Sequence, residues 1–258
     1  MKQPMKIRVK TPRYLFMTTT LLSVLYASQA WSAIALDRTR IIFNGEQKSV
    51  SLTITNKNPQ LPYLAQGWIE NNQSQKVSLP FVVLPPIQRL EPKKTSQIRI
   101  EALPEVAQLP QDRESLFYFN LREIPPKSDK PNVLQLALQS KIKLFYRPQG
   151  IELSDTEKMS QPWQNKLILT KQDDQYIAKN PTPFYVTIIG ASATANAPIT
   201  KQFDAVMVAP FSEHTLGVSS TQLGNSPVLT YINDYGGRLK LHFKCQGNEC
   251  FVLTDKQL

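Results

Sequence analysis

Apolar and polar residues alternate along several short stretches of the chain. The clearest is residues 49–55, where Val50, Leu52 and Ile54 share one face of a two-residue repeat. A period of two over seven residues predicts a half-buried β-strand. Further stretches predicted as strands in the first half are 64–69, 81–84, 96–100, 116–122, 133–138 and 141–146. Pro and Asn clusters separate these stretches and no stretch of about ten residues repeats at helical spacing, which favours an all-β sandwich.

The strand pattern pauses after residues 146–150, where Pro and Gly punctuate the chain and a polar stretch follows. It then resumes over residues 167–169, 176–177, 185–189, 205–208, 228–232, 239–243 and 251–253. The sequence therefore predicts two all-β sandwich domains, residues 33–148 and 151–258. Both have ordinary domain sizes.

The N-terminus has the pattern of a secretory signal peptide. Five basic residues and no acidic one lie in the first 13 positions, and a mostly apolar stretch of about 14 residues follows. Small residues then mark a cleavage site after Ser32, with cleavage after Ala30 fitting nearly as well. A membrane anchor is the alternative, but the apolar stretch is short and no stop-transfer pattern follows. Residues 1–32 are therefore assigned as the signal, and the mature chain as exported.

Removal of the signal changes the charge of the protein. The full chain has 30 basic and 20 acidic residues, a net charge of +10. Without residues 1–32 it keeps 25 basic and 20 acidic residues, a net charge of +5. This mild excess is not typical of a nucleic-acid-binding protein, although it suits a partner that presents a negative group.

Export also changes the interpretation of the two cysteines. Cys245 and Cys250 flank the sequence Gln-Gly-Asn-Glu, which is typical of a tight turn. In an oxidising compartment, two cysteines on either side of a turn are expected to pair across a hairpin. A redox-active pair is the alternative, but four intervening residues do not match the Cys-x-x-Cys spacing.

Residues typical of catalysis are mostly absent from the sequence. His214 lies in a polar segment predicted as a turn, and His242 is predicted to face solvent from a strand. There is no Gly-x-Ser-x-Gly motif, phosphate-binding glycine loop or metal-ligand spacing. The sequence thus favours a binding protein without metal or cofactor over an enzyme.

Three segments carry more information than the rest. They are residues 37–40 (Asp-Arg-Thr-Arg), the alternating stretch with Leu134, Leu136 and Leu138, and residues 231–238 (Tyr-Ile-Asn-Asp-Tyr-Gly-Gly-Arg). Taken singly, they are compatible with a charged strand end, a core strand and a hairpin turn.

Together, and in this order after a signal peptide, these segments resemble one family across essentially the whole mature chain. It is the family of periplasmic pilus-assembly chaperones of the chaperone–usher pathway. The segments that carry the resemblance are residues 36–40, 60–66, 88–92, 110–126, 141–148, 180–187 and 231–238.

The resemblance implies two immunoglobulin-like domains in a boomerang arrangement. It implies a chaperone that binds, folds and caps pilus subunits, lends its seventh strand to their incomplete sandwich and delivers them to an outer-membrane usher. That donor strand is expected over residues 132–146. Leu134, Leu136 and Leu138 match the alternating donor residues, and a two-residue period puts them on one face. The short, polar segment before them resembles the short-loop branch of the family.

The resemblance also assigns charged residues. Arg40 and Lys143 match the pair that anchors the C-terminal carboxylate of a subunit, while Arg38 and Lys141 are close neighbours of the same charge. A half-buried carboxylate needs good pairing, and Arg can bind both of its oxygens.

A second matched set is an interdomain ion triad of Glu114, Arg147 and Asp234. Because buried ion groups are weak evidence for net stability, the triad is expected to fix the domain angle rather than to add stability.

The expected protein is thus a periplasmic chaperone with pilins, an adhesin and an usher as partners, and with neither cofactor nor nucleic acid. Self-association of the free chain stays open. Three alternatives are a pilus subunit, an exported hydrolase and an exported β-sandwich of another binding function. The length and the second strand pattern argue against a subunit, and the missing catalytic residues argue against a hydrolase.

Overall fold

The computed structural model describes residues 33–129, 131–160, 162–201 and 203–253, so the predicted signal and its cleavage site lie outside the described residues. The strands of the first half are β1 (Ile34–Leu36), β2 (Arg40–Asn44), β3 (Ser49–Asn56), β4 (Tyr63–Asn71), β5 (Lys76–Val77), β6 (Phe81–Leu84), β7 (Ile87–Leu90), β8 (Thr95–Ala102), β9 (Ser115–Ile124) and β10 (Gln139–Arg147). Those of the second half are β11 (Ile168–Gln172), β12 (Gln175–Asn180), β13 (Val186–Ser192), β14 (Val206–Val208), β15 (Ser212–Ser219), β16 (Val228–Ile232), β17 (Arg238–Gln246) and β18 (Glu249–Val252).

Helices are few and short in the described part of the chain. They are the α-helices α2 (Asp155–Ser160) and α3 (Ser220–Leu223) and the 3-10 helices η2 (Pro104–Gln108), η3 (Gln149–Ile151) and η4 (Trp163–Lys166). Within these residues, no helix has the length and apolar character needed to cross a membrane.

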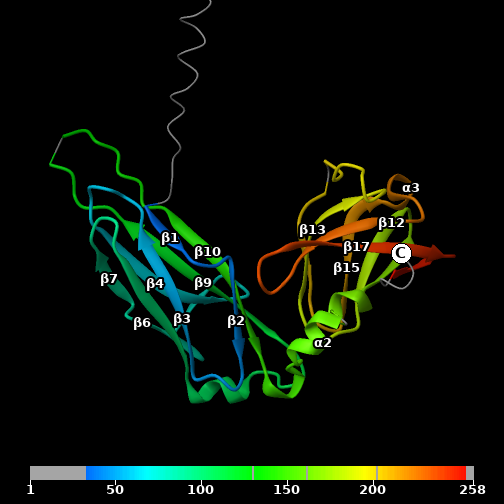
Figure 1. Ribbon diagram of the computed structural model, residues 1–258, viewed down its shortest axis with the longest axis horizontal. Coiled ribbons are helices and arrows are strands. Elements are labelled where there is room, and N and C mark those ends of the chain that lie inside the picture. Colours follow the sequence, from blue (N-terminus) through cyan, green and yellow to red (C-terminus); the bar gives the residue numbers. More distant parts are fainter. Residues whose placement is uncertain (1–32, 130, 161, 202, 254–258) are drawn as a thin grey trace, which may run out of the picture. The chain divides into compact units, whose positions relative to one another are not determined.

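Strands β1–β10 form the N-terminal sandwich (Figure 1). One sheet has the order β1-β3-β8-β6, and the other has the order β2-β10-β9-β4-β5 with β7 beside β4. Both sheets contribute fully buried side chains to one core, among them Leu52 and Ile54 from β3 and Phe119 from β9. Full burial of such a side chain is worth about 1.5–3 kcal/mol, which explains why the alternating pattern predicted β3 so closely.

Strands β11–β18 form the C-terminal sandwich. They join in the order β14-β13-β16-β17-β18-β11-β12-β15, and the two end strands, β14 and β15, contact each other. The sheet therefore closes around a single core that includes Tyr176, Ile188, Leu229 and Phe243. The all-β, two-sandwich prediction is confirmed.

The predicted strand over residues 133–138 is wrong for the chain by itself. Strand β10 begins only at Gln139, and its last bond to β9 before that point runs from the Glu123 amide to the Leu138 carbonyl, at 2.9 Å. Beyond Ile124, Pro125 and Pro126 carry no amide hydrogen, so this end of β9 offers no further backbone donors with which residues 133–138 could pair. Figure 1 shows the connection between β9 and β10 as a long loop that leaves the sheet.

Two histidine predictions need correction. His214 lies in strand β15 rather than in a turn, although it is exposed as expected. His242 is half-buried in β17 rather than exposed. Strand β15 escaped prediction because only Leu216 and Val218 of its eight residues alternate as buried apolar side chains.

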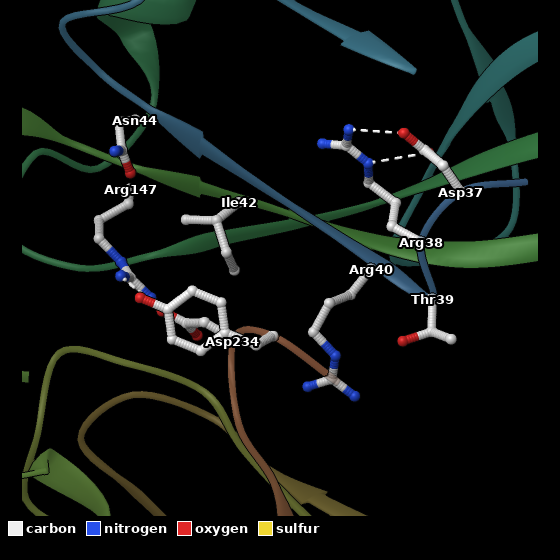
Figure 2. A pocket seen from close by; sticks show the side chains of 9 residues that line it. Asp37, Arg38, Thr39, Arg40, Ile42, Asn44, Arg147 and Asp234 are labelled. Carbon is white, nitrogen blue, oxygen red and sulfur yellow. Dashed lines mark hydrogen bonds and ion pairs between the residues drawn. The ribbon is translucent and has the colours of Figure 1, made fainter. Parts of the chain in front are cut away.

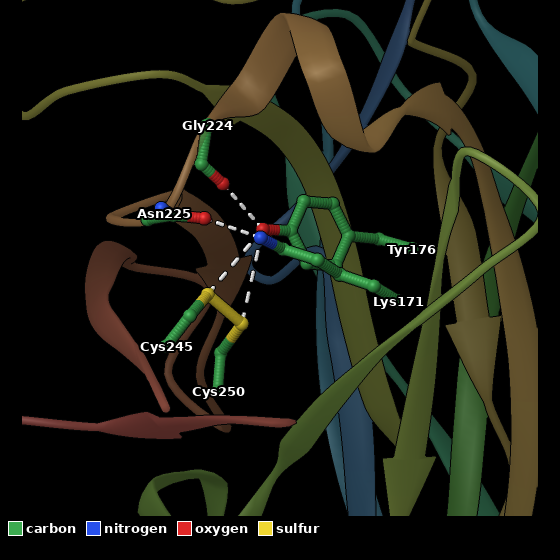
Figure 3. The surroundings of a disulfide bond; sticks show 6 residues. All are labelled: Lys171, Tyr176, Gly224, Asn225, Cys245 and Cys250. Carbon is green, nitrogen blue, oxygen red and sulfur yellow. Dashed lines mark hydrogen bonds between the residues drawn. A yellow bond between two sulfur atoms is a disulfide. The ribbon is translucent and has the colours of Figure 1, made fainter. Parts of the chain in front are cut away.

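The predicted disulfide is confirmed. Cys245 on β17 and Cys250 on β18 are register partners across a hairpin and are bonded to each other. Figure 3 shows the Tyr176 hydroxyl beside both sulfurs, 3.4 Å from Cys245 Sγ, while it donates to the Gly224 carbonyl. The disulfide therefore packs into the edge of the C-terminal core as a structural link.

A buried asparagine organises one turn of the C-terminal sandwich. The side-chain nitrogen Nδ2 of Asn180 donates to the backbone carbonyls of Phe184 (2.7 Å) and Ala209 (2.9 Å). The side-chain oxygen Oδ1 accepts from the hydroxyl (2.7 Å) and the backbone amide (3.1 Å) of Thr182. The side chain satisfies backbone groups that otherwise have no access to water, because Asn180 is 1% exposed.

Replacement of this asparagine tests its contribution to stability. We expect Asn180→Ala to lower the free energy of unfolding by about 2–4 kcal/mol, because several buried polar groups lose their partner. Urea unfolding followed by far-UV circular dichroism measures the change. Asn196→Ala, at an exposed position, is the control and should change it by less than about 0.5 kcal/mol. Equal effects in the two variants would contradict the assignment.

Candidate functional site

A polar cavity of about 410 Å³ lies along one face of strand β2. Its lining residues are Asp37, Arg38, Thr39, Arg40, Ile42, Asn44, Arg147, Asp234 and Tyr235 (Figure 2). The even-numbered residues of β2 contribute to it because successive side chains of a strand point to opposite faces. Asp234 and Tyr235 come from the β16–β17 hairpin, so both sandwiches contribute to the cavity.

Arg40 lines this cavity, and Lys143 lies next to Arg40 on the neighbouring strand β10. They are register partners in the parallel pairing of β2 with β10. Arg40 Nη1 donates to the Ile232 carbonyl at 3.2 Å, and Lys143 Nζ donates to Thr187 Oγ1 at 3.2 Å. Neither cation forms an ion pair with a carboxylate of the described residues.

The two partners of these cations also lie next to each other. Thr187 and Ile232 are register partners on β13 and β16. A pair of neighbouring residues in the N-terminal sandwich thus faces a pair of neighbouring residues in the C-terminal sandwich. The position of both cations depends on both sandwiches.

The surroundings of these cations make their charge costly. Burial, and secondarily the positive charge of Arg40, lowers the pKa of Lys143 to about 8. Burial likewise lowers the pKa of Arg40, while Asp234 opposes the shift. Arg40 Nε is buried without a hydrogen-bond partner in the described part of the chain. A bound anion would relieve both costs.

The neighbouring cations are already paired. Arg38 donates from Nε and Nη2 to the two carboxylate oxygens of Asp37, at 3.0 and 2.9 Å, as Figure 2 shows. Lys141 Nζ donates to Glu70 Oε2 at 2.7 Å and to Ser74 Oγ at 3.0 Å. The structure thus distinguishes Arg40 and Lys143 from Arg38 and Lys141, which strand alternation alone did not.

The three residues predicted as an ion triad meet in the structure. Arg147 Nε and Nη2 both donate to Glu114 Oε1, at 2.9 and 2.7 Å, and Arg147 Nη1 donates to Asp234 Oδ2 at 2.9 Å. The second oxygen of Glu114 accepts the Tyr185 amide at 2.7 Å, and the Glu114 amide donates to the Pro183 carbonyl. These bonds link the ends of β9 and β10 to the C-terminal sandwich.

The triad is buried, and its members affect each other's ionisation. The Arg147 and Glu114 side chains are 1% and 2% exposed. Burial raises the pKa of Glu114 to about 7, against the positive charge of Arg147. Although burial opposes it, the charges of Glu114 and Asp234 raise the pKa of Arg147, which therefore stays protonated.

A close backbone approach places the β16–β17 hairpin against the N-terminal sandwich. Gly236 has a φ of +82°, and a Cβ at this position would lie 2.6 Å from Thr39 Oγ1. Only glycine satisfies both conditions without displacing the hairpin. Asp234 and Tyr235 are thereby held beside Arg40, and Tyr235 is 85% exposed.

The three leucines of the predicted donor segment are exposed. Leu134, Leu136 and Leu138 are 83%, 66% and 47% accessible, and none of them lies in a strand. Large apolar side chains at three alternating positions of one loop form an unusual exposed apolar surface, which typically marks an interaction site.

Sequence reasoning missed the partners that complete the site. Phe184, Thr187 and Ile232 lie in the segments 180–187 and 231–238, but no role was assigned to them from the sequence. Trp163, which packs against Arg147, lies in a segment with no motif of its own. No periodic signal marks such contacts because they depend on how the two sandwiches meet. Within the described residues, no cluster of His, Cys, Asp and Glu has the arrangement of a metal site.

These features define a class of protein: two β-sandwiches that share a cationic cavity and expose an apolar loop. Residues 33–152 match the family described as "Pili and flagellar-assembly chaperone, PapD N-terminal domain", and residues 162–243 match "Pili assembly chaperone PapD, C-terminal domain". The chain therefore belongs to the PapD family of pilus-assembly chaperones, as its sequence motifs indicated.

Individual relatives agree with this assignment. The chain is 51% identical over 230 residues to the chaperone protein PapD of Escherichia coli, covering 89% of this chain and 93% of PapD. It is 45% identical over 236 residues to the probable fimbrial chaperone YfcS of Escherichia coli K12, covering 92% of each. Among solved structures, the Salmonella enterica SafA pilin in complex with the SafB chaperone matches with a TM-score of 0.69 and 25% identity, covering 85% of this chain and 99% of the matched chain.

Replacement of the central arginine tests the triad. We expect Arg147→Met to lower the free energy of unfolding by about 3–5 kcal/mol at about pH 8, because Glu114 loses the cation that lowers its pKa and must either take up a proton at that pH or carry a buried charge without a partner. The loss should shrink at about pH 5.5, since Glu114, whose pKa is raised, becomes neutral as the pH falls. Urea unfolding at both pH values measures this.

The matched control is Arg38→Met, which breaks the more exposed pair with Asp37 and should cost at most about 1 kcal/mol. A loss for Arg147→Met that is no larger than this, or that does not change with pH, would contradict a buried charge network.

Proposed function

We propose that this protein is a periplasmic chaperone that binds and caps pilus subunits and delivers them to an outer-membrane usher. The observation that supports it most is the pair Arg40 and Lys143. Two half-buried cations lie side by side within a chain of the pilus-chaperone family, and among the described residues their side chains bond to a carbonyl and a hydroxyl but to no carboxylate. The C-terminal carboxylate of a pilin would satisfy both, since charge-assisted bonds compensate for burial. Export by the N-terminal signal would bring the protein to the periplasm.

The exposed leucines supply the second part of the proposal. Residues 132–146 would act as the donor strand when a pilin is bound. The segment that contains Leu134, Leu136 and Leu138 lies outside the sheet and directly precedes β10. The incomplete sandwich of a pilin would give this segment the ladder that β9 does not provide, and the leucines would fill the exposed groove.

The two parts work together through register. Lys143 lies five residues after Leu138 on one continuous segment, so binding of the carboxylate fixes which residues of the donor meet the pilin. A one-residue slip would turn all three leucines to the other face. The triad of Glu114, Arg147 and Asp234 would orient the two domains rather than contact the pilin.

Co-expression with the pilus subunits of the same gene cluster tests the proposal. The wild type should be recovered from the periplasm as a stoichiometric complex with a pilin, and Arg40→Ala should lose it while remaining folded. Arg38→Ala is the control and should keep the complex, because Arg38 is already paired with Asp37. A complex that survives Arg40→Ala would contradict the anchor, and no complex with any pilin would contradict the function.

The donor leucines give a matched pair of variants. Leu136→Asp should weaken pilin binding by at least about tenfold, because one buried leucine is worth about 1.5–3 kcal/mol. Ala137→Asp introduces the same charge at the neighbouring exposed position, which faces the other way in an extended strand, and should have little effect. Competition binding with purified complex measures both variants, and equal losses would argue against an alternating donor.

The anchor should also make binding depend on pH. Free Lys143 has a pKa of about 8, and a carboxylate ligand favours its charged form. Binding should therefore take up a proton and weaken as the pH rises above about 8, by up to about tenfold per pH unit. Isothermal titration with a peptide that has the C-terminal sequence of a pilin, at about pH 7 and pH 9.5, measures this. Lys143→Arg keeps its charge, so the same decline in that variant would refute the lysine as the titrating group.

A further inference from the structure

Arg147 is held by two aromatic rings as well as by two carboxylates. Its guanidinium carbon lies 5.1 Å from the centre of the Trp163 ring and 4.9 Å from that of Phe184. Both distances are within the range of cation–π attraction, which is stronger where water is excluded. The Arg147 side chain is 1% exposed, so both contacts lie in a dry environment.

The two rings belong to the C-terminal core. Trp163 begins the 3-10 helix η4, and Phe184 lies just before β13. Their ring centres are 4.8 Å apart, and both residues are part of the main apolar cluster of this sandwich. The core therefore fixes the rings, and Arg147, the last residue of β10, inserts against them from the N-terminal sandwich.

The indole nitrogen of Trp163 shows which part of this side chain matters. Trp163 Nε1 is buried and has no hydrogen-bond partner in the described part of the chain. An unpaired buried donor is unfavourable, and a smaller aromatic residue such as phenylalanine would not carry that cost. The contribution that offsets it is the face of the ring towards Arg147, since Trp gives the strongest cation–π contact.

The contact with the rings continues along one face of β10. Lys143, Phe145 and Arg147 alternate on this strand, and each one touches the C-terminal sandwich. Lys143 bonds to Thr187, the Phe145 ring lies 5.5 Å from the Tyr185 ring, and Arg147 lies against Phe184. Lys143 is about 13 Å along the strand from Arg147, with no break between them. A shift of Arg147 therefore changes how Lys143 meets Thr187.

We propose that Trp163 and Phe184 are positioning residues for the pilin-binding site. Their rings seat Arg147 between Glu114 and Asp234 and so set the spacing at which Arg40 and Lys143 face Ile232 and Thr187. This inference rests on the proposed function. It adds that affinity for the C-terminal carboxylate of a pilin depends on two aromatic side chains that do not touch the pilin.

The test compares affinities for two peptides with the C-terminal sequence of a pilin, one with a free carboxylate and one with a C-terminal amide. The wild type should prefer the carboxylate. Trp163→Leu should reduce that preference by about fivefold to tenfold, whereas Trp163→Phe, which keeps a ring, should retain most of it. Phe243→Leu is the control, because Phe243 is a fully buried aromatic residue of the same core that has no ring contact with Arg147. It should lower stability without changing the preference.

A double-variant cycle separates positioning from general loss of packing. The double variant Trp163→Leu/Arg147→Met should show the same carboxylate preference as Arg147→Met alone, because both substitutions remove the same contact. Independent, multiplying effects, or an unchanged preference in folded Trp163→Leu, would overturn the proposal. If Trp163→Leu does not fold, Phe184→Leu takes its place as the variant that loses a ring, and Trp163→Phe remains the variant that keeps one.

A measurement on the free protein keeps this inference distinct from the proposed function. The NMR signal of the Arg147 Nε proton combines the downfield effect of its bond to Glu114 with the ring currents of Trp163 and Phe184. It should move in Trp163→Leu, because one ring current is lost. If the wild type shows no carboxylate preference, the proposed function fails whatever this signal does. If the preference is present but the signal does not move, the positioning role is overturned.

Discussion

The buried contact of Arg147 with Glu114 and Asp234 is the interaction on which the rest of this structure depends. Each sandwich has its own core, which holds most of its buried apolar residues. The polar and aromatic contacts around the Arg147 guanidinium join the two, together with the Arg40–Ile232, Lys143–Thr187 and Phe145–Tyr185 contacts. The polar contacts are directional where apolar contacts are not. Replacing all members of such a buried ion group with apolar side chains often leaves stability unchanged or raises it, whereas removing one member alone is costly. The group as a whole therefore contributes mainly a defined geometry.

The contacts between the sandwiches decide what surrounds Arg40 and Lys143, which the pairing of β2 with β10 already places side by side. Their partners Ile232 and Thr187 come from neighbouring strands of the other sandwich. Each cation gives one donor to that sandwich and has further donors that a bound carboxylate would accept. An anion site built across two domains in this manner is only as well defined as the angle between them. The proposed chaperone activity therefore depends on residues far from the bound pilin.

The sequence predicted most of the fold for a physical reason. Alternating burial is strong in strands such as β3 and β6, and the Cys245–Cys250 turn needs only local chemistry. Prediction failed where the alternation was weak, as in β15, or where an alternating segment has no neighbouring strand among the described residues, as with Leu134, Leu136 and Leu138. An apolar repeat shows that a segment can bury one face, but not whether the cover comes from this chain or from another.

The site shows the same division. Family resemblance selected Arg40 over Arg38, and the structure gives the physical distinction, since Arg38 is satisfied by Asp37 and Arg40 has no carboxylate partner in the described region. Trp163 lies outside the motif segments, and Phe184 lies inside one of them (residues 180–187) but had no assigned role. An aromatic residue near a turn is ordinarily a core residue, and here each of the two is both a core residue and a contact of Arg147.

If Arg147 fixes the orientation of one sandwich relative to the other, its replacement should alter the distance between the two sandwiches. The most direct test is the distribution of distances between two spin labels, attached to cysteines at the exposed positions Ser51 and Thr215 and measured by pulsed electron resonance. We expect one narrow distribution for the otherwise wild-type protein and a clearly broader or shifted one for Arg147→Met in its folded form. An unchanged narrow distribution in that variant would show that Arg147 does not set the orientation.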